Sequence, residues 1–111
     1  LKGARVLVLG VAYKPDLGDV RESPSLRVMA ALGRRGVKLS FHDPFVAEVT
    51  VDGRRLARTD LSARAVAGAD LVALLTPHSH YDLDWLARTA ALLFDARNAY
   101  GPGERPNLVK L

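Results

Sequence analysis

Four consecutive apolar residues, Val6-Leu7-Val8-Leu9, stand near the start of the chain and end at Gly10. A strand that is buried on both faces needs such an unbroken apolar run, whereas a strand with one wet face alternates apolar and polar residues. A second run, from Leu71 to Leu75, lies further along the chain. The sequence therefore predicts a sheet covered on both faces, which is typical of parallel sheets with crossover helices.

Helix signals lie between and after these runs. Ser23 is a suitable N-cap, Pro24 suits the first helical position, and Gly36 can end the helix in a left-handed conformation. Apolar residues between them recur at three- and four-residue spacings, which gives the helix one apolar face. Asp82 predicts the cap of a later helix.

Shorter elements are predicted in the middle of the chain. Residues 60–67 predict a short helix with Asp60 as its cap and Gly68 as its stop. The pair Asp52-Gly53 predicts a type I′ turn in a small hairpin.

Strands are also predicted over residues 37–41 and 92–94, and residues 101–111, which carry two prolines, are expected to trail along the surface. This alternation predicts an α/β fold: a Rossmann-like three-layer α/β/α arrangement with a mostly parallel sheet of about four to six strands. At 111 residues the chain is expected to form a single domain, residues 1–111.

The composition limits the classes of ligand and chemistry. The chain has no cysteine, so these residues form no disulfide, no thiolate metal site and no cysteine nucleophile. A net charge of +4 favours anionic ligands. Nucleic acid is not expected, because the basic residues are scattered and only 6% of residues are aromatic. No apolar run approaches the roughly 20 residues of a membrane-spanning helix, so no membrane partner is expected.

Polar residues follow each predicted strand, at the point where the strand ends. Because the carboxyl ends of parallel strands share one edge of the sheet, these residues are expected to meet there, and ligands of open α/β sheets bind at that edge. The set comprises Gly10, Tyr13, Lys14, Asp16, His42, Asp43, Thr76, His78, Asp95 and Arg97.

The loop after the first strand lacks the glycines of a dinucleotide fingerprint. Only Gly10 is present where G-x-G-x-x-G would bring backbone amides close to a pyrophosphate. The loop instead offers charged side chains: Lys14 supplies a point charge, and Arg21 a planar fork beside a helix N-terminus. We interpret it as a loop that binds phosphate through side chains. Spacing alone leaves open that both are solvated surface charges.

Two clusters allow a metal hypothesis. Asp16, Asp19 and Glu22 are close in sequence, but such acids more often neutralise neighbouring bases or cap a helix, and this interpretation is preferred. His78 and His80 lack a clear third ligand for zinc, so an exposed loop position is expected for them, and no metal site is predicted.

A Ser–His–Asp triad can be assembled on paper from Ser79, His42 and Asp43. It is discounted because no nucleophile-elbow pattern accompanies it, and no catalytic residue is predicted in this chain. Asp43 is interpreted as a turn residue before Pro44, with a ribose contact as the alternative.

The segment from Gly10 to Pro24, GVAYKPDLGDVRESP, closely resembles the signature that opens the C-terminal domain of the UDP-glucose/GDP-mannose dehydrogenase family. The resemblance continues through His42-Asp43-Pro44 to Asp95-Ala96-Arg97-Asn98 and is weakest between residues 46 and 61. It implies an NAD-dependent enzyme that oxidises the 6-hydroxyl of a nucleotide-linked sugar to a carboxylate. Precursor synthesis for polysaccharides in the cytoplasm is the expected setting.

The same resemblance implies roles for individual residues. Tyr13 and Lys14 are expected to contact the UDP-sugar, with Lys14 close to its phosphates, and Arg97 matches a further substrate-binding arginine. Arg21 falls where the family places an arginine that reaches NAD, which is bound mainly by an N-terminal domain. The motif at residues 42–44 leans toward UDP-N-acetylhexosamines such as UDP-N-acetylmannosamine.

The family's catalytic cysteine has no counterpart in these residues, so the resemblance implies a fragment whose NAD-binding and central domains are absent. The start at Leu1 suits that expectation. The full-length enzyme is expected to be a homodimer or higher oligomer, and the domain alone to be inactive. One rival is a stand-alone nucleotide-binding or regulatory module. A receiver-like signalling domain is the other, but acids are missing directly after the first strand.

Overall fold

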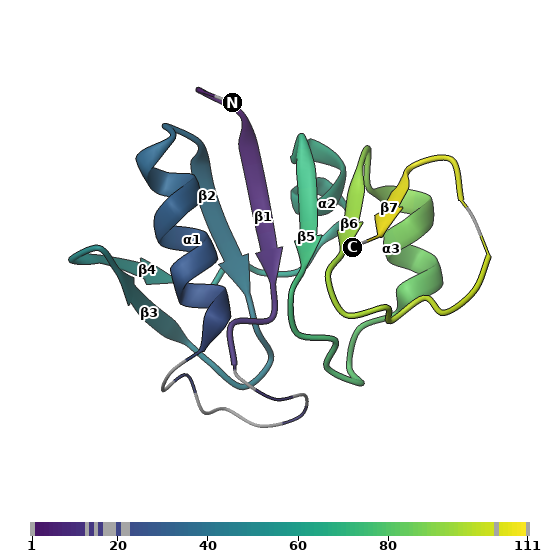
Figure 1. Cartoon of the computed structure of the whole chain (residues 1–111), viewed down its shortest axis with the longest axis horizontal. Coiled ribbons are helices and arrows are strands. Elements are labelled where there is room, and N and C mark those ends of the chain that lie inside the picture. Colours follow the sequence, from purple (N-terminus) through teal and green to yellow (C-terminus); the bar gives the residue numbers. More distant parts are fainter. Residues whose placement is uncertain are drawn as a thin grey trace.

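A parallel sheet carries the fold (Figure 1). The computed structural model describes residues 2–12, 14, 16, 20, 23–103 and 105–110. Within these residues, five parallel strands lie in the order β2-β1-β5-β6-β7, which confirms the predicted α/β fold. The strands are β1 (Arg5–Leu9), β2 (Lys38–His42), β5 (Leu71–Leu74), β6 (Leu93–Asp95) and β7 (Leu108–Lys110).

The apolar run in β1 is buried on both faces of the sheet. Val6 and Val8 face one core while Leu7 and Leu9 face the other, and none is more than 3% exposed. Helix α1 (Pro24–Arg34) covers the first core, and α2 (Ala63–Gly68) and α3 (Leu83–Thr89) cover the second (Figure 1). The predicted three-layer arrangement is therefore confirmed.

Helix α1 begins and ends as its sequence predicts. The Ser23 hydroxyl accepts a hydrogen bond from the backbone N–H of Ser25, and Pro24 is the first helical residue. After the helix, Gly36 has a φ of +82°, the left-handed conformation that glycine adopts without strain.

The predicted hairpin is also present, as β3 (Glu48–Val51) and β4 (Arg54–Ala57). Asp52 and Gly53 have φ values of +48° and +79°, and a type I′ turn requires a positive φ at both positions. Val49 and Val51 are buried against the core under α1, so the hairpin extends that layer.

The predicted cap of α2 was wrong. Ser62, not Asp60, is the N-cap, and its hydroxyl accepts from the backbone N–H of Ala65 at 3.1 Å. Asp60 lies too early in the chain to reach the first turn. Gly68 ends the helix as expected, although it is the last helical residue rather than a left-handed stop.

The end of the chain was also predicted wrongly. Instead of trailing along the surface, residues 108–110 form β7, which pairs in parallel with β6 at the edge of the sheet. The Asn107 amide donates hydrogen bonds to the backbone oxygens of Ala87 and Ala90 and so ties this strand to the end of α3.

Among the residues that the structure describes, no helix is long and apolar enough to cross a bilayer.

Candidate functional site

The turns after β1, β2, β5 and β6 meet at one edge of the sheet (Figure 1). Strand order reverses at β1, which has β2 on one side and β5 on the other. The connections after β1 and β5 lead to helices on opposite faces, α1 and α3, and open α/β sheets bind ligands where such connections part. For the members of the predicted polar set that the structure describes, which leaves out Tyr13, the convergence at this edge is confirmed.

Asp43, directly after β2, is the centre of a buried hydrogen-bond network and is 0% exposed. Its Oδ2 accepts from the backbone N–H groups of Val11 at 2.9 Å and Ala12 at 3.2 Å, and Oδ1 accepts from that of Phe45 at 2.8 Å. A buried carboxylate needs such donors to offset its lost hydration. The turn role predicted for Asp43 is thus confirmed, whereas a buried carboxylate is out of reach of a ribose.

His78 binds Asp43 and the loop after β1 at once. Its Nε2 lies 2.8 Å from Oδ2 of Asp43, and its Nδ1 accepts from the backbone N–H of Asp16 at 2.7 Å. Because a backbone N–H can only donate, Nδ1 carries a lone pair and Nε2 carries the proton that is donated to Asp43. His78 is only 2% exposed, so the exposed loop position expected for it was wrong; His80 is exposed as expected.

Asp16 closes the link between the loops after β1 and β5. Its Oδ1 accepts from the backbone N–H of Ser79 at 2.8 Å and from the Ser79 hydroxyl at 3.0 Å. These bonds favour the charged carboxylate and lower the pKa of Asp16 below its ordinary value. Asp16 also has a φ of +63°, which aspartate tolerates better than most residues.

Two hydroxyl groups hold the backbone just after β1. The Thr76 hydroxyl donates to the carbonyl of Ala12 and the Ser23 hydroxyl to that of Val11, both at 2.6 Å. Together with Asp43, they fix residues 11 and 12 from the ends of β2 and β5 and from the start of α1.

Gly10 is required at the end of β1 for a steric reason. A Cβ atom there would lie 2.3 Å from the carbonyl oxygen of Thr76 and 2.6 Å from its Cβ, and the φ is +87°. The glycine lets the end of β1 pass the end of β5, rather than bringing backbone amides to a pyrophosphate as in the dinucleotide fingerprint.

His42 and Tyr81 form a second, partly buried pair. The Tyr81 hydroxyl donates to the backbone oxygen of His42 at 2.9 Å, so Nδ1 of His42, 3.2 Å away, donates to that hydroxyl. Burial raises the pKa of Tyr81 far above its usual range, which keeps the hydroxyl protonated. Burial, aided by the charge of Arg58, lowers the pKa of His42.

Asp95 holds the turn that carries Arg97. Its buried carboxylate accepts from the backbone N–H groups of Arg97, Ala99 and Tyr100 at 3.0 to 3.1 Å. Asn98 in this turn has a φ of +56°. Arg97 is exposed, two residues beyond β6 at the carboxyl edge, and it also engages a neighbouring group.

Of the predicted ligand-binding residues, Lys14 and Arg97 are described, and both lie beyond the carboxyl ends of strands with exposed side chains. Tyr13 and Arg21 lie outside the described residues. The hydrogen bonds of His78 to Asp16 and Asp43 were not predicted from the sequence. The position of His78 after β5 placed it at the carboxyl edge, but no sequence pattern indicated that it is buried.

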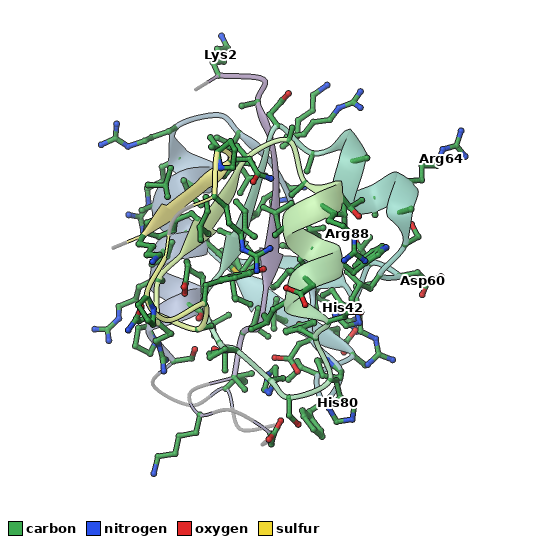
Figure 2. The ribbon with its side chains drawn as sticks, turned by 90° about the vertical axis from the view of Figure 1, so that its right-hand side faces the viewer. Lys2, His42, Asp60, Arg64, His80 and Arg88 are labelled. Atoms are coloured by element: carbon green, nitrogen blue, oxygen red, sulfur yellow. The ribbon has the colours of Figure 1, made fainter. Side chains whose placement is uncertain are left out.

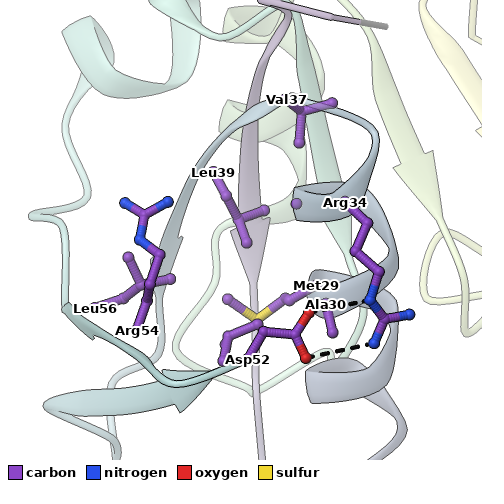
Figure 3. Close-up of a pocket in the computed structure, with 10 residues that line it drawn as sticks. Met29, Ala30, Arg34, Val37, Leu39, Asp52, Arg54 and Leu56 are labelled. Atoms are coloured by element: carbon purple, nitrogen blue, oxygen red, sulfur yellow. Dashed lines mark hydrogen bonds and ion pairs between the residues drawn. The ribbon is translucent and has the colours of Figure 1, made fainter.

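A separate hollow of about 170 Å³ lies between α1 and the hairpin (Figure 3). Met29, Leu39, Val51 and Leu56 contribute its apolar wall, and an ion pair between Arg34 and Asp52 at 3.1 Å borders it. None of its lining residues belongs to the loops at the carboxyl edge.

The described residues contain no cluster of three or more histidine, aspartate or glutamate side chains that could hold a metal ion. Asp19 and Glu22 lie outside them. Ser79, His42 and Asp43 bind Asp16, Tyr81 and His78 respectively rather than one another, so the discounted triad is absent.

Comparisons with known proteins show the family of this chain. A model of the UDP-binding domain of the UDP-glucose/GDP-mannose dehydrogenase family matches residues 7–102. UDP-glucose 6-dehydrogenase from Pseudomonas aeruginosa is 36% identical over an alignment of 120 positions, which covers 96% of this chain and 26% of that protein.

Solved structures give the same result. NDP-N-acetyl-D-galactosaminuronic acid dehydrogenase from Methanosarcina mazei Go1 matches with a TM-score of 0.72 and 26% identity, over 99% of this chain and 24% of that one. UDP-D-ManNAc dehydrogenase from Pyrococcus horikoshii matches with a TM-score of 0.70 and 25% identity, over 98% and 25% of the two chains. This chain spans about a quarter of the length of these relatives.

Proposed function

The chain belongs to the UDP-glucose/GDP-mannose dehydrogenase family, as its UDP-binding domain, and from this premise we propose that Lys14 and Arg97 bind the diphosphate of a UDP-sugar. Both cations lie beyond the carboxyl ends of their strands, and only β5 separates β1 from β6. Adjacent strands are about 4.8 Å apart, so long side chains on these turns are able to reach one ligand. Lysine and arginine form strong charge-assisted hydrogen bonds to phosphate.

The single observation that carries this proposal is the placement of both cations at one edge, on turns that buried groups hold in place. Asp43, Thr76 and His78 fix the backbone on either side of Lys14, and Asp95 fixes the turn of Arg97. Preorganised turns lose little conformational freedom when a ligand binds.

Tyr13 and Arg21 complete the proposed site. Tyr13 is assigned a substrate contact and Arg21 a contact to NAD across a domain cleft, on the strength of the sequence motif that contains them.

We propose that the full-length protein is an NAD-dependent UDP-sugar 6-dehydrogenase, with NAD as the hydride acceptor. The relatives are about four times longer than this chain, and its 111 residues contain no cysteine to form the covalent intermediate. An NAD-binding domain, a central domain, a homodimer or larger oligomer, and a cytoplasmic role in making polysaccharide precursors belong to the same proposal. They rest on the family resemblance.

The sugar of the proposed substrate is an N-acetylhexosamine. The relatives named above act on different sugars, and the motif at residues 42–44 favours an N-acetylhexosamine by resemblance. However, the side chains of His42 and Asp43 are engaged with Tyr81 and His78. Any effect of this motif on sugar choice is therefore indirect.

Calorimetric titration with UDP tests the proposed site. Lys14→Ala and Arg97→Ala should each raise the Kd for UDP about tenfold, the loss expected for one charge-assisted hydrogen bond. Lys2→Ala and Arg64→Ala are matched controls, because they remove the same charges far from His42 and His80 (Figure 2). An unchanged Kd in Lys14→Ala and Arg97→Ala would remove both residues from the site.

A further inference from the structure

We propose that His78 is a positioning residue: it sets the conformation of the loop that presents Lys14 to the diphosphate. This inference rests on the proposed function. His78 lies on the loop after β5, and it acts on Lys14 through the backbone N–H of Asp16.

The hydrogen bonds of His78 are the first support. Each ring nitrogen has a partner: Nδ1 accepts from Asp16 and Nε2 donates to Asp43. Buried ring nitrogens require partners, and here the two partners lie on different segments, Asp43 after β2 and Asp16 in the loop after β1. The imidazole therefore connects Asp43, at the end of β2, to the loop that follows β1.

The position of Lys14 is the second support. On one side of it, Ala12 is held by Asp43 and Thr76; on the other side, Asp16 is held by His78. Lys14 itself is exposed. Because Ala12 and Asp16 are held in this way, binding of a ligand by Lys14 should cost less conformational entropy.

Removing the hydrogen bond between the backbone N–H of Asp16 and His78 should keep the charge of Lys14 but let the backbone beside it sample more conformations. Affinity for the phosphates should fall, while the fold, which Asp43 still joins to residues 11 and 12, should persist. The effect should be lost once Lys14 is absent, because His78 acts through it.

The test is a double-mutant cycle measured by UDP titration. His78→Phe keeps a ring against Phe45 and Tyr81 but removes both hydrogen bonds, and it should raise the Kd for UDP about tenfold. In a Lys14→Ala background the same change should alter the Kd by less than about twofold. His78→Gln, which offers one donor and one acceptor, should recover most of the affinity. His80→Phe, the same change two residues away, should have no effect.

Ser79→Ala provides a second variant that leaves the core untouched. It removes one bond to the Asp16 carboxylate and should raise the Kd about twofold, again only when Lys14 is present. Full UDP affinity in folded His78→Phe, or equal losses in both Lys14 backgrounds, would overturn the positioning role. A wild-type protein that binds no UDP would instead overturn the proposed function itself.

Discussion

Asp43 and Asp95 are both buried carboxylates at the carboxyl edge, yet they organise the protein over different distances. The donors of Asp95 are backbone N–H groups two, four and five residues further along the chain. The donors of Asp43 include Val11, Ala12 and His78, which lie 31 to 35 residues away.

This difference separates two ways of building a binding loop. Asp95 shapes only its own turn, the one that presents Arg97, and a short peptide carries all the required groups. Asp43 joins the ends of β1, β2 and β5, so the loop of Lys14 exists only when the sheet is assembled. Loss of the Asp95 carboxylate should disturb only its own turn, whereas loss of the Asp43 carboxylate should disturb the ends of β1, β2 and β5.

Replacing each carboxylate by its amide tests this contrast directly. Asp43→Asn should lower the free energy of unfolding by about 3 kcal/mol and Asp95→Asn by about 2 kcal/mol, because an amide nitrogen cannot accept from the buried donors. Hydrogen exchange measured by NMR should quicken at residues 11, 12 and 16 in the first variant, and only at residues 97–100 in the second. Equal and global effects would contradict the distinction.

The close approach of β1 and β5 at Gly10 is a long-range contact, like the bonds of Asp43, because Gly10 meets Thr76. Gly10→Ala should destabilise the protein by about 2 kcal/mol more than Gly53→Ala, as measured by urea unfolding. Both glycines have positive φ, but an added Cβ collides with Thr76 at Gly10 and meets nothing within 4 Å at Gly53. Similar losses would show that the two strand ends have room to separate.

The cap of α2 is a local interaction, like the bonds of Asp95, because it joins residues that are three positions apart. Ser62→Ala should cost about 1 kcal/mol of unfolding free energy, since one hydrogen bond to the first turn is lost. Asp60→Ala removes the residue that the sequence suggested and should change stability by less than about 0.5 kcal/mol. Thermal unfolding of both variants checks this, and a larger loss for Asp60→Ala would restore it as the cap.

The smallest effect is expected from the titration of His42. Its pKa in the folded state lies below the ordinary value of 6.5, so the unfolded chain binds this proton more readily. The contribution of His42 to the free energy of unfolding is therefore fully present above pH 6.5 and is lost as the pH drops below that value. His42→Asn keeps a donor for the Tyr81 hydroxyl but does not titrate, so its melting temperature should depend less on pH between 7 and about 5. Parallel pH profiles for both proteins would exclude His42 as the source.

Local signals made much of the fold predictable. The apolar run of β1, the Ser23-Pro24 start of α1 and the Asp52-Gly53 turn each depend on residues that are neighbours in sequence. The edge strand β7 was not predictable in the same way, because it is short and pairs with β6 only after the sheet has formed.

The site divides along the same line. Parallel topology allowed the carboxyl edge and the placement of Lys14 and Arg97 there to be predicted. The role of His78 was not predictable, since its burial and its bonds to Asp16 and Asp43 depend on segments 35 to 62 residues away.

An NMR titration of the ¹⁵N-labelled chain with UDP shows at which edge or hollow of the domain the ligand binds. The largest amide shifts are expected at residues 11–14, 16, 76, 78–80 and 96–98, around the carboxyl edge. Residues that line the hollow beside α1, such as Met29 and Val51, should keep their positions in the spectrum (Figure 3). Shifts confined to that hollow, with no change at the carboxyl edge, would contradict the proposed UDP site.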